Sequence, residues 1–497
     1  MTSPRDGSDD ERISSGARWA TTLDLATLAL VARVAVVAYA LAEPVWDGHY
    51  YDLGARRIAA GLGYSEELHL STPGGTEQVI WHPWAHYPVG YSGFLALFFK
   101  VFGGALAVAP LANALTGAAL VAVVHRLALH VFPVATSQRA RRATLAALLV
   151  AVHPGLVLYS GALMTEPLAA LGMLAAVLFV VADREPWRGA AAAGVVLGLT
   201  TLVRPNAILI APFLPFLSPG DARVPWLRRV PGWVGRGAVV AVLALGTVLP
   251  WTLRNCRVMD RCALVSTNAG WNLVIGSAPG ATGKFEFLVG HTPEGGPTCA
   301  AGGQVEQDRC WWGYGVATIR HDVRRWLALV PEKLHYTLDS EWFPINYLRE
   351  ARPDLVDART HVLWGRVLTG AQQALLVLAA LAALGAPRAS RARLLALSVQ
   401  LGLFAALIAL TVAGLQASEP RVWALGVAAC VLPFVPLPGA PKREPAELGV
   451  AAIVLTTLVT HAVFFGEDRY HLVATPALVL LACGLGRPMR PRRLVAA

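Results

Sequence analysis

Long apolar stretches recur along the chain, separated by short segments rich in charge, glycine and proline. A transmembrane helix needs about 20 mostly apolar residues, so stretches near that length indicate membrane spans. The pattern predicts about twelve spans, at residues 22–42, 105–131, 143–161, 166–182, 189–204, 206–218, 237–254, 362–385, 393–415, 421–438, 447–465 and 472–487. The stretch 1–21 is polar and acidic, without a basic start leading into a short apolar core. We expect it to be a cytoplasmic tail and not a cleaved signal peptide.

The composition excludes a water-soluble protein, because 55% of the 497 residues are hydrophobic and only 15% are charged. We expect an all-α polytopic membrane protein. The formal net charge of +10 could indicate a nucleic-acid partner. The arginines, however, form short clusters between apolar stretches, which is typical of membrane topology. We therefore expect a bilayer and no nucleic acid.

Basic residues also orient the chain in the membrane. With the first residues in the cytoplasm, the arginine clusters fall in inner segments, and the short outer turns hold only Arg204, Arg421 and Arg469. The apolar stretch 91–102 has about 12 residues, too few to cross a ~30 Å core at ~1.5 Å per residue. If it crossed, the basic cluster at 139–142 would lie outside. We expect a helix lying at the outer face.

This topology divides the chain after the tail into three parts. Residues 22–254 form an N-terminal membrane module whose first outer loop, 43–104, holds interfacial helices. Residues 255–361 form an extracytoplasmic segment, and 362–497 form the C-terminal membrane helices. In this topology, the residues whose side chains could take part in a reaction all fall on the outer side.

Asp47 begins an amphipathic helix in the first outer loop, in the stretch WDGHYYDLGARRIAAGLGY. Gly61 and Gly63 are expected to end that helix. A carboxylate held at the membrane surface can take a proton from a substrate that arrives through the lipid. Asp52 is the competing carboxylate, but it faces another side of the helix and suits a solvated position.

A second carboxylate, Glu166, stands at the head of a span in the stretch SGALMTEP. An ionisable group at that depth is costly and normally has a partner or a function. It could help to place the acceptor or a divalent cation near Asp47. The alternative is that Thr165 and Glu166 only cap the helix before Pro167.

Donor groups occur at several outer positions. His82, His86 and Tyr87, in HPWAHYPVGYSGF, could present donors to a phosphate, or could form an interfacial belt. Arginine keeps its charge and grips phosphate with a fork of donors. Phosphate-binding candidates of this kind close two apolar spans and occupy one outer turn: Arg204, Arg254, and Arg469 with Tyr470. The alternatives are snorkelling anchors for the first two and an interfacial turn for Asp468–His471.

The extracytoplasmic segment mixes two short β-type runs, 263–267 and 272–276, with glycine-rich turns and a helix expected over 314–338. A small mixed α/β unit is expected. Its four cysteines allow three pairings, of which Cys256 with Cys262 and Cys299 with Cys310 close the shortest loops. The sequence contains no CxxC spacing, so a metal site is not favoured. The remaining cysteines, Cys430 and Cys483, lie in spans and suit packing.

The ordered set of motifs resembles a known family. Asp47 with its Tyr-x-x-x-Ala and Gly-x-Gly-Tyr sequel, HYPVGYSGFLALFFKVFG, LMTEP, LVRPNA, PWTLRN, STNAGWNLVIGSAPGATG and RYHLVATP together resemble the bacterial GT-C membrane glycosyltransferases. These include relatives of the protein O-mannosyltransferases and of the lipid A aminoarabinose transferase. The resemblance implies a polyprenyl-phosphate-sugar donor, inversion at the anomeric carbon and Asp47 as the base. Departures are Gly48, where a second acidic residue is usual, and PVG in place of a Lys-Pro-Pro element.

We therefore expect a sugar transferase at the extracytoplasmic face of a bacterial inner membrane, with an acceptor that the sequence does not specify. The sequence has no glycine loop that would cradle phosphates before a helix, which argues against a nucleotide-sugar donor. One alternative is a flippase for lipid-linked sugars, although no inverted repeat is evident and Arg33 is the main charge within a span. Another is a lipid-linked glycan polymerase or ligase.

Overall fold

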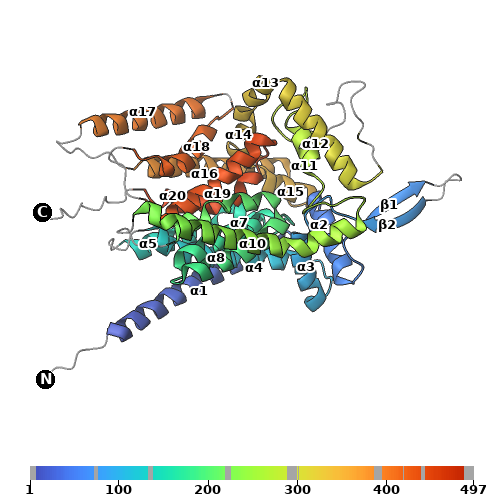
Figure 1. The fold of residues 1–497 in the computed structure, drawn as a ribbon, viewed down its shortest axis with the longest axis horizontal. Helices are drawn as coiled ribbons and strands as arrows, with labels where there is room; N and C mark the ends of the chain where they lie inside the picture. Colours follow the sequence, from blue (N-terminus) through green and yellow to red (C-terminus); the bar gives the residue numbers. More distant parts are fainter. Residues whose placement is uncertain are drawn as a thin grey trace.

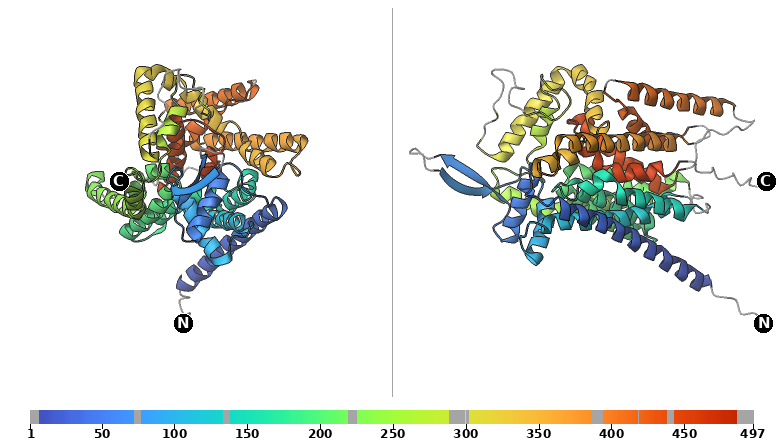
Figure 2. Two further views of the ribbon diagram at one scale, coloured as in Figure 1. Left: turned by 90° about the vertical axis from the view of Figure 1, so that its right-hand side faces the viewer. Right: turned by 180° about the vertical axis from the view of Figure 1, so that it is seen from behind.

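A computed structural model describes residues 7–71, 77–132, 138–218, 225–287, 299, 302–385, 394–417, 419–437 and 443–485. The described chain is mostly helical, and its long helices lie side by side in an elongated bundle (Figure 1). Helix α1 begins at one end of the bundle, and a β-hairpin projects from the other (Figures 1 and 2). The all-α polytopic class expected from the sequence is confirmed.

The helices in chain order are α1 (Gly7–Tyr39), α2 (Asp47–Ala59), α3 (Val89–Phe102), α4 (Val108–Val131), α5 (Arg139–Val152), α6 (Pro154–Leu158), α7 (Glu166–Ala182), α8 (Pro186–Val203), α9 (Leu214–Leu217), α10 (Trp226–Val258), α11 (Ala269–Ile275), α12 (Gln304–His321), α13 (Val323–Ala328), α14 (Val330–Leu338), α15 (Phe343–Ala351), α16 (Ala358–Leu384), α17 (Leu394–Gln416), α18 (Trp423–Val431), α19 (Pro445–Val463) and α20 (Thr475–Ala482). Short 3-10 helices are η1 (Pro205–Ile210), η2 (Leu432–Phe434) and η3 (Tyr470–Val473).

Seven of the described helices are long and apolar enough to cross a membrane. They are Arg18–Tyr39 of α1, α4, α8, Leu227–Val258 of α10, α16, Leu397–Gln416 of α17, and α19. Within the described residues, each of the twelve expected spans overlaps helical segments, but those at 143–161, 206–218, 421–438 and 472–487 are each divided into short pieces. Proline explains the first break, because the residue before Pro154 adopts an extended ψ of 120° that ends α5.

Helices α8 and α10 run in the same direction. Gly194 and Gly198 of α8 lie against Val240 and Ala244 of α10, and a Cβ on either glycine would come within 3.0 Å of the α10 backbone. Small residues of this kind allow helices to approach closely in a bilayer. Because both helices run in the same direction, the chain between them, which includes η1 and α9, must travel back along the bundle before α10 begins. The expected topology requires the same return.

Arg33 lies inside α1 and is fully buried at 1% exposure. Its guanidinium donates to the carbonyls of Ala151 at 2.9 Å and Val150 at 3.3 Å, at the C-terminal end of α5. The negative end of a helix compensates a buried cation. This intraspan charge therefore joins α1 to α5.

Residues 255–361 differ from the expected α/β unit. The run 272–276 lies mostly in helix α11, and 263–267 forms no strand, so both β expectations are wrong. Short apolar runs do not distinguish strand from helix, and here Val274 and Ile275 pack as a helical face against Trp311. The helix expected over 314–338 begins earlier, at Gln304, and breaks at Asp322 and Leu329 into α12, α13 and α14.

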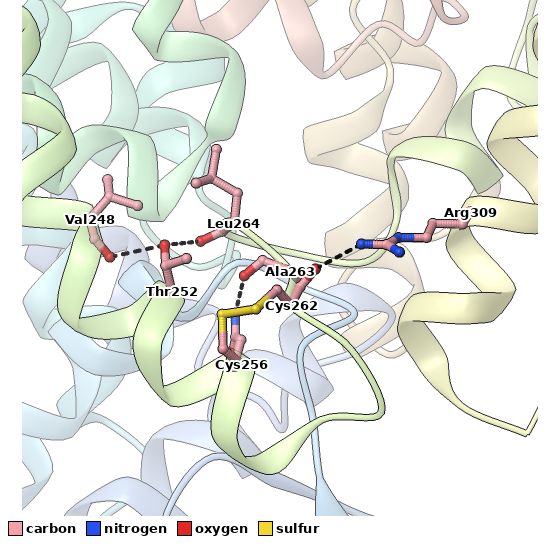
Figure 3. The surroundings of a disulfide bond; sticks show 8 residues. Val248, Thr252, Cys256, Cys262, Ala263, Leu264 and Arg309 are labelled. Atoms are coloured by element: carbon pink, nitrogen blue, oxygen red, sulfur yellow. Dashed lines mark hydrogen bonds between the residues drawn. A yellow bond between two sulfur atoms is a disulfide. The ribbon is translucent and has the colours of Figure 1, made fainter.

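Both disulfides join the expected cysteines, Cys256 with Cys262 and Cys299 with Cys310. Figure 3 shows the first, at the C-terminal turn of α10. The hydroxyl of Thr252 donates to the carbonyl of Leu264 at 2.7 Å, so the chain folds back along α10. The segment after α10 is therefore held against that helix by a covalent bond and a hydrogen bond.

The only sheet among the described residues is an antiparallel hairpin of β1 (Ser65–Ser71) and β2 (Glu77–Pro83), in register from Ser65 opposite Pro83 to Ser71 opposite Glu77. It lies in the first outer loop between α2 and α3. The sequence analysis placed helices in this loop but did not predict the hairpin. The expected helices at α2 and α3 are present, and Gly61 and Gly63 follow α2 with φ of 76° and 75°.

Candidate active site

Asp47 is the first residue of α2, at a tight turn from α1. Trp46 adopts a positive φ of 52°, and the amide of Gly48 donates to the carbonyl of Val45 at 3.0 Å. A Cβ at position 48 would lie 2.5 Å from the hydroxyl of Tyr347, which itself accepts from the amide of Val45 at 3.1 Å. The turn therefore requires glycine at the position where the resembled family usually has an acidic residue.

The carboxylate of Asp47 has two partners from distant parts of the chain. The hydroxyl of Tyr87 donates to Oδ1 at 2.7 Å, and Nη1 of Arg469 donates to Oδ2 at 2.6 Å. The Asp47 side chain keeps 22% of its surface exposed. It is thus fixed by two donors and still accessible.

Arg469 pairs with two carboxylates at once. Its Nε lies 2.5 Å from Oε2 of Glu467, in addition to the contact with Asp47. Its guanidinium carbon lies 5.1 Å from the ring centre of Phe343 and 5.0 Å from that of Tyr470. Only 13% of the side chain is exposed, so the cation is confined between anions and aromatic faces.

Opposing influences set the protonation of these carboxylates. Burial raises the pKa of Asp47, but Arg469 and the hydrogen bond from Tyr87 lower it by more, so the net pKa falls below the ordinary value. Burial raises the pKa of Glu467 to about 7, against the opposing charge of Arg469. Near neutral pH, Asp47 is therefore ionised, whereas Glu467 is present in both its protonated and its ionised form.

Glu166 and Arg204 form a second ion pair. Nη1 of Arg204 donates to Oε1 of Glu166 at 2.7 Å and to the hydroxyl of Thr165 at 3.1 Å. Glu166 is only 2% exposed, Arg204 is 14% exposed, and Oε2 of Glu166 has no hydrogen-bond partner among the described residues. Arg204 lies 5.2 Å from the Tyr470 ring centre, so this ring contacts the guanidinium groups of both ion pairs.

Neither carboxylate is arranged as part of a metal site. Within the described ranges, no group of three or more His, Cys, Asp or Glu side chains could hold a metal ion. Asp47 and Glu166 are each paired with an arginine instead. The divalent cation considered for Glu166 therefore does not fit these residues.

Three predicted donors lie elsewhere or contribute indirectly. Arg254 donates to the backbone carbonyls of Trp84 at 3.0 Å and Tyr64 at 2.6 Å, and so fastens the first outer loop to α10. His82 lies in β2, with Nε2 3.0 Å from Glu66. His86 packs its ring 5.0 Å from that of Tyr87; burial lowers its pKa more than Asp47 raises it.

Some residues around the site carry no clear sequence signal. Glu467 adjoins a recognised turn, but only the fold shows that it shares Arg469 with Asp47. Asp468 accepts from the amides of Trp342 at 2.5 Å and Phe343 at 3.0 Å, which anchors the turn to α15. The fully buried His471 lies with Nε2 3.5 Å from Glu341, and these contacts fix the position of Arg469 between them.

One family model matches part of the chain. Residues 86–251 match the model described as dolichyl-phosphate-mannose-protein mannosyltransferase, which confirms the resemblance to GT-C membrane glycosyltransferases. The matched range includes Tyr87, Glu166 and Arg204, whereas Asp47 and Arg469 lie outside it. No curated protein sequence matches the chain.

Solved structures give the particular proteins that the chain is similar to. The archaeal oligosaccharyltransferase AglB from Archaeoglobus fulgidus, in complex with an inhibitory peptide and a dolichol-phosphate, has 13% identity and a TM-score of 0.45, covering 95% of this chain and 50% of that one. The Archaeoglobus fulgidus oligosaccharyltransferase tethered to an acceptor peptide has 16% identity and a TM-score of 0.43, covering 93% and 49%. The chain thus spans about half the length of these structures.

Proposed function

We propose that the chain is an integral-membrane glycosyltransferase that moves a sugar from a polyprenyl-phosphate carrier to an acceptor hydroxyl, with inversion. The observation that carries the proposal is the ionised, partly exposed Asp47 in direct contact with Arg469. A base beside a fixed cation suits a reaction in which a hydroxyl loses a proton while a phosphate departs. The family match over 86–251 supports the same chemistry.

Asp47 acts as the general base. The acceptor oxygen attacks the anomeric carbon and gives its proton to Asp47, while the bond from that carbon to the phosphate oxygen breaks. The phosphate leaves with the bonding electron pair, so a single displacement inverts the carbon. A carboxylate with a lowered pKa is a weak base, and its proton transfer therefore comes late in the transition state.

Arg469 stabilises the leaving phosphate. Charge builds on that group as the bond breaks, and guanidinium donors held in a site that excludes water stabilise it most effectively. Protonation of Glu467, whose pKa is about 7, releases the Nε side of Arg469 from its anionic partner. Arg469 can then bind a phosphate while it keeps its ion pair with Asp47.

Glu166 acts in this scheme by holding Arg204. It is too buried to touch a substrate, but its pairing orients the second guanidinium beside Tyr470. Arg254 and His82 are left out of the phosphate site, because backbone carbonyls and Glu66 occupy their polar groups. The proposed active site faces the extracytoplasmic side of a bacterial inner membrane, as the arginine clusters favour.

Replacement of Asp47 tests the proposal. Purified Asp47→Asn protein in proteoliposomes is supplied with a radiolabelled polyprenyl-phosphate sugar and membrane extract. We expect glycosidic-bond formation to fall at least 1,000-fold with donor binding retained. Asp52→Asn, on the same helix and paired with Arg56, is the matched control and should keep its turnover.

Transfer at the wild-type rate by Asp47→Asn would refute the proposal. Exposure of the labelled lipid without a new glycosidic bond in the wild type would indicate a flippase instead. Mass spectrometry of envelope glycans and glycoproteins from a deletion strain identifies the acceptor, and separates a protein or lipid acceptor from a growing glycan.

A further inference from the structure

Two exposed aromatic rings flank the proposed base. Trp46 directly precedes Asp47 and is 41% exposed, and Tyr50, one helical turn later, is 44% exposed. Large aromatic side chains usually bury most of their surface in a packed fold. These two rings therefore keep part of their apolar faces exposed, close in the chain to the carboxylate of Asp47.

Trp46 is held in place by its neighbours and by its backbone. Its ring packs 5.4 Å from that of Phe343 and 5.6 Å from that of Tyr347, centre to centre. Its φ of 52° and ψ of −133° lie where non-glycine residues are strained. Strain of this kind persists where the surrounding structure fixes it, often at a functional site.

Tyr50 belongs to a second aromatic group. Its ring lies 5.7 Å from that of Trp84 and 5.8 Å from that of Tyr87, whose hydroxyl holds Asp47. Phe343 connects Trp46 to Arg469. Each exposed ring is thus one side chain away from the Asp47–Arg469 pair.

A sugar ring matches this arrangement chemically. One face of a pyranose or furanose presents C–H bonds that pack on an aromatic face, while its hydroxyl edges need charged or polar partners. An interfacial belt alone would account for the exposure of Trp46 and Tyr50, but it would not require a strained backbone at the residue next to the base. A ring that must be fixed relative to Asp47 explains both observations.

Resting on the proposed function, we propose that Trp46 and Tyr50 form a saccharide subsite that stacks a sugar ring beside Asp47. The ring belongs either to the donor or to the acceptor, and the subsite sets which sugar is placed for reaction. Stacking of this kind contributes enough that loss of one aromatic face should weaken saccharide binding roughly 3- to 10-fold.

Binding measurements test the subsite without depending on turnover. Full-length protein in nanodiscs is titrated with farnesyl-phosphoryl mannose, farnesyl-phosphoryl arabinose, farnesyl phosphate, methyl mannoside and methyl arabinofuranoside. The variants are Trp46→Leu and Tyr50→Leu, and Trp46→Phe keeps an aromatic face. Trp312→Leu, in α12 and 46% exposed, is the matched control.

Weaker binding of the farnesyl-phosphoryl sugars, with farnesyl phosphate unchanged, places the donor sugar on the rings. Weaker binding of the methyl glycosides alone places the acceptor sugar there, and Trp46→Phe should restore either. Wild-type affinities in both leucine variants, or no sugar-dependent binding in the wild type, overturn the subsite. If binding depends on Trp46 but no transfer occurs, only the proposed function fails.

Discussion

Removal of Arg469 should move the pH dependence of the reaction in a defined direction. In the wild type, this arginine and Tyr87 hold the pKa of Asp47 below its ordinary value despite burial. In Arg469→Gln, the effect of burial is opposed only by the Tyr87 hydrogen bond and the nearby His86, and the pKa of Asp47 rises. The base then becomes protonated at a higher pH, so kcat/KM should begin its acid-side fall nearer to neutrality.

The structure sets the size of this effect. Nη1 of Arg469 and Oδ2 of Asp47 are 2.6 Å apart, which places the charge centres about 4 Å apart. At an effective dielectric constant of ~20, such a pair interacts by roughly 4 kcal/mol. Asp47 keeps 22% exposure, and solvent weakens the interaction to about half of that. At about 1.4 kcal/mol per pH unit, the acid limb should move up by roughly one and a half units.

The assay measures kcat/KM for sugar transfer from pH 4 to 9 in wild type, Arg469→Gln and Arg469→Lys. Lysine keeps the charge but lacks the fork that reaches Asp47 and Glu467 together, so its acid limb should move least. Binding of farnesyl phosphate reports separately on phosphate recognition and should weaken in both variants. An acid limb that stays in place, or moves to lower pH, in Arg469→Gln would refute the electrostatic role given to this residue.

Two further predictions concern the groups around this pair. Because Glu467 has a pKa of about 7 and competes for Arg469 when ionised, the KM for donor should rise as pH increases from 6 to 8, and Glu467→Gln should abolish that rise. A pH-dependent KM that persists in this variant contradicts the assignment. Arg254→Ala should lose about 1–3 kcal/mol of stability, seen as a lower Tm, because two loop carbonyls lose a charged donor. Its KM for donor should stay within about twofold of wild type. A tenfold rise in KM at unchanged Tm would instead show that Arg254 binds the donor phosphate.

Residue type and position at the ends of spans predicted several residues that the structure brings together in the candidate site. Asp47, Tyr87 and Arg469 meet, and Tyr470 connects them to the Glu166–Arg204 pair. Charged and aromatic groups at the ends of apolar helices have few ways to be satisfied other than by one another, which explains the convergence. Arg254 also lies at the end of a span, but its hydrogen bonds to the carbonyls of Tyr64 and Trp84 depend on how the hairpin packs, which the sequence does not show.

The remaining features depend on contacts between distant segments. The β-type runs at 263–267 and 272–276 were too short for periodicity to distinguish strand from helix, and packing against Trp311 decided the second. Glu467 adjoins Asp468 and Arg469 in sequence, and nothing local shows which of the two acids faces Asp47. The requirement for glycine at position 48 comes from Tyr347, far along the chain.

The partners Asp47 and Arg469 are separated by 422 residues. At about 5–20 residues per second, a ribosome needs roughly 20 to 80 s to go from one to the other. During that interval the first helices have already entered the bilayer, where lipid substrates are present, while the aspartate has no counter-charge. Under the proposed function, the Asp47–Arg469 pair is therefore completed only in a late step of biogenesis, and a nascent chain that stalls before α19 and the turn behind it would lack it.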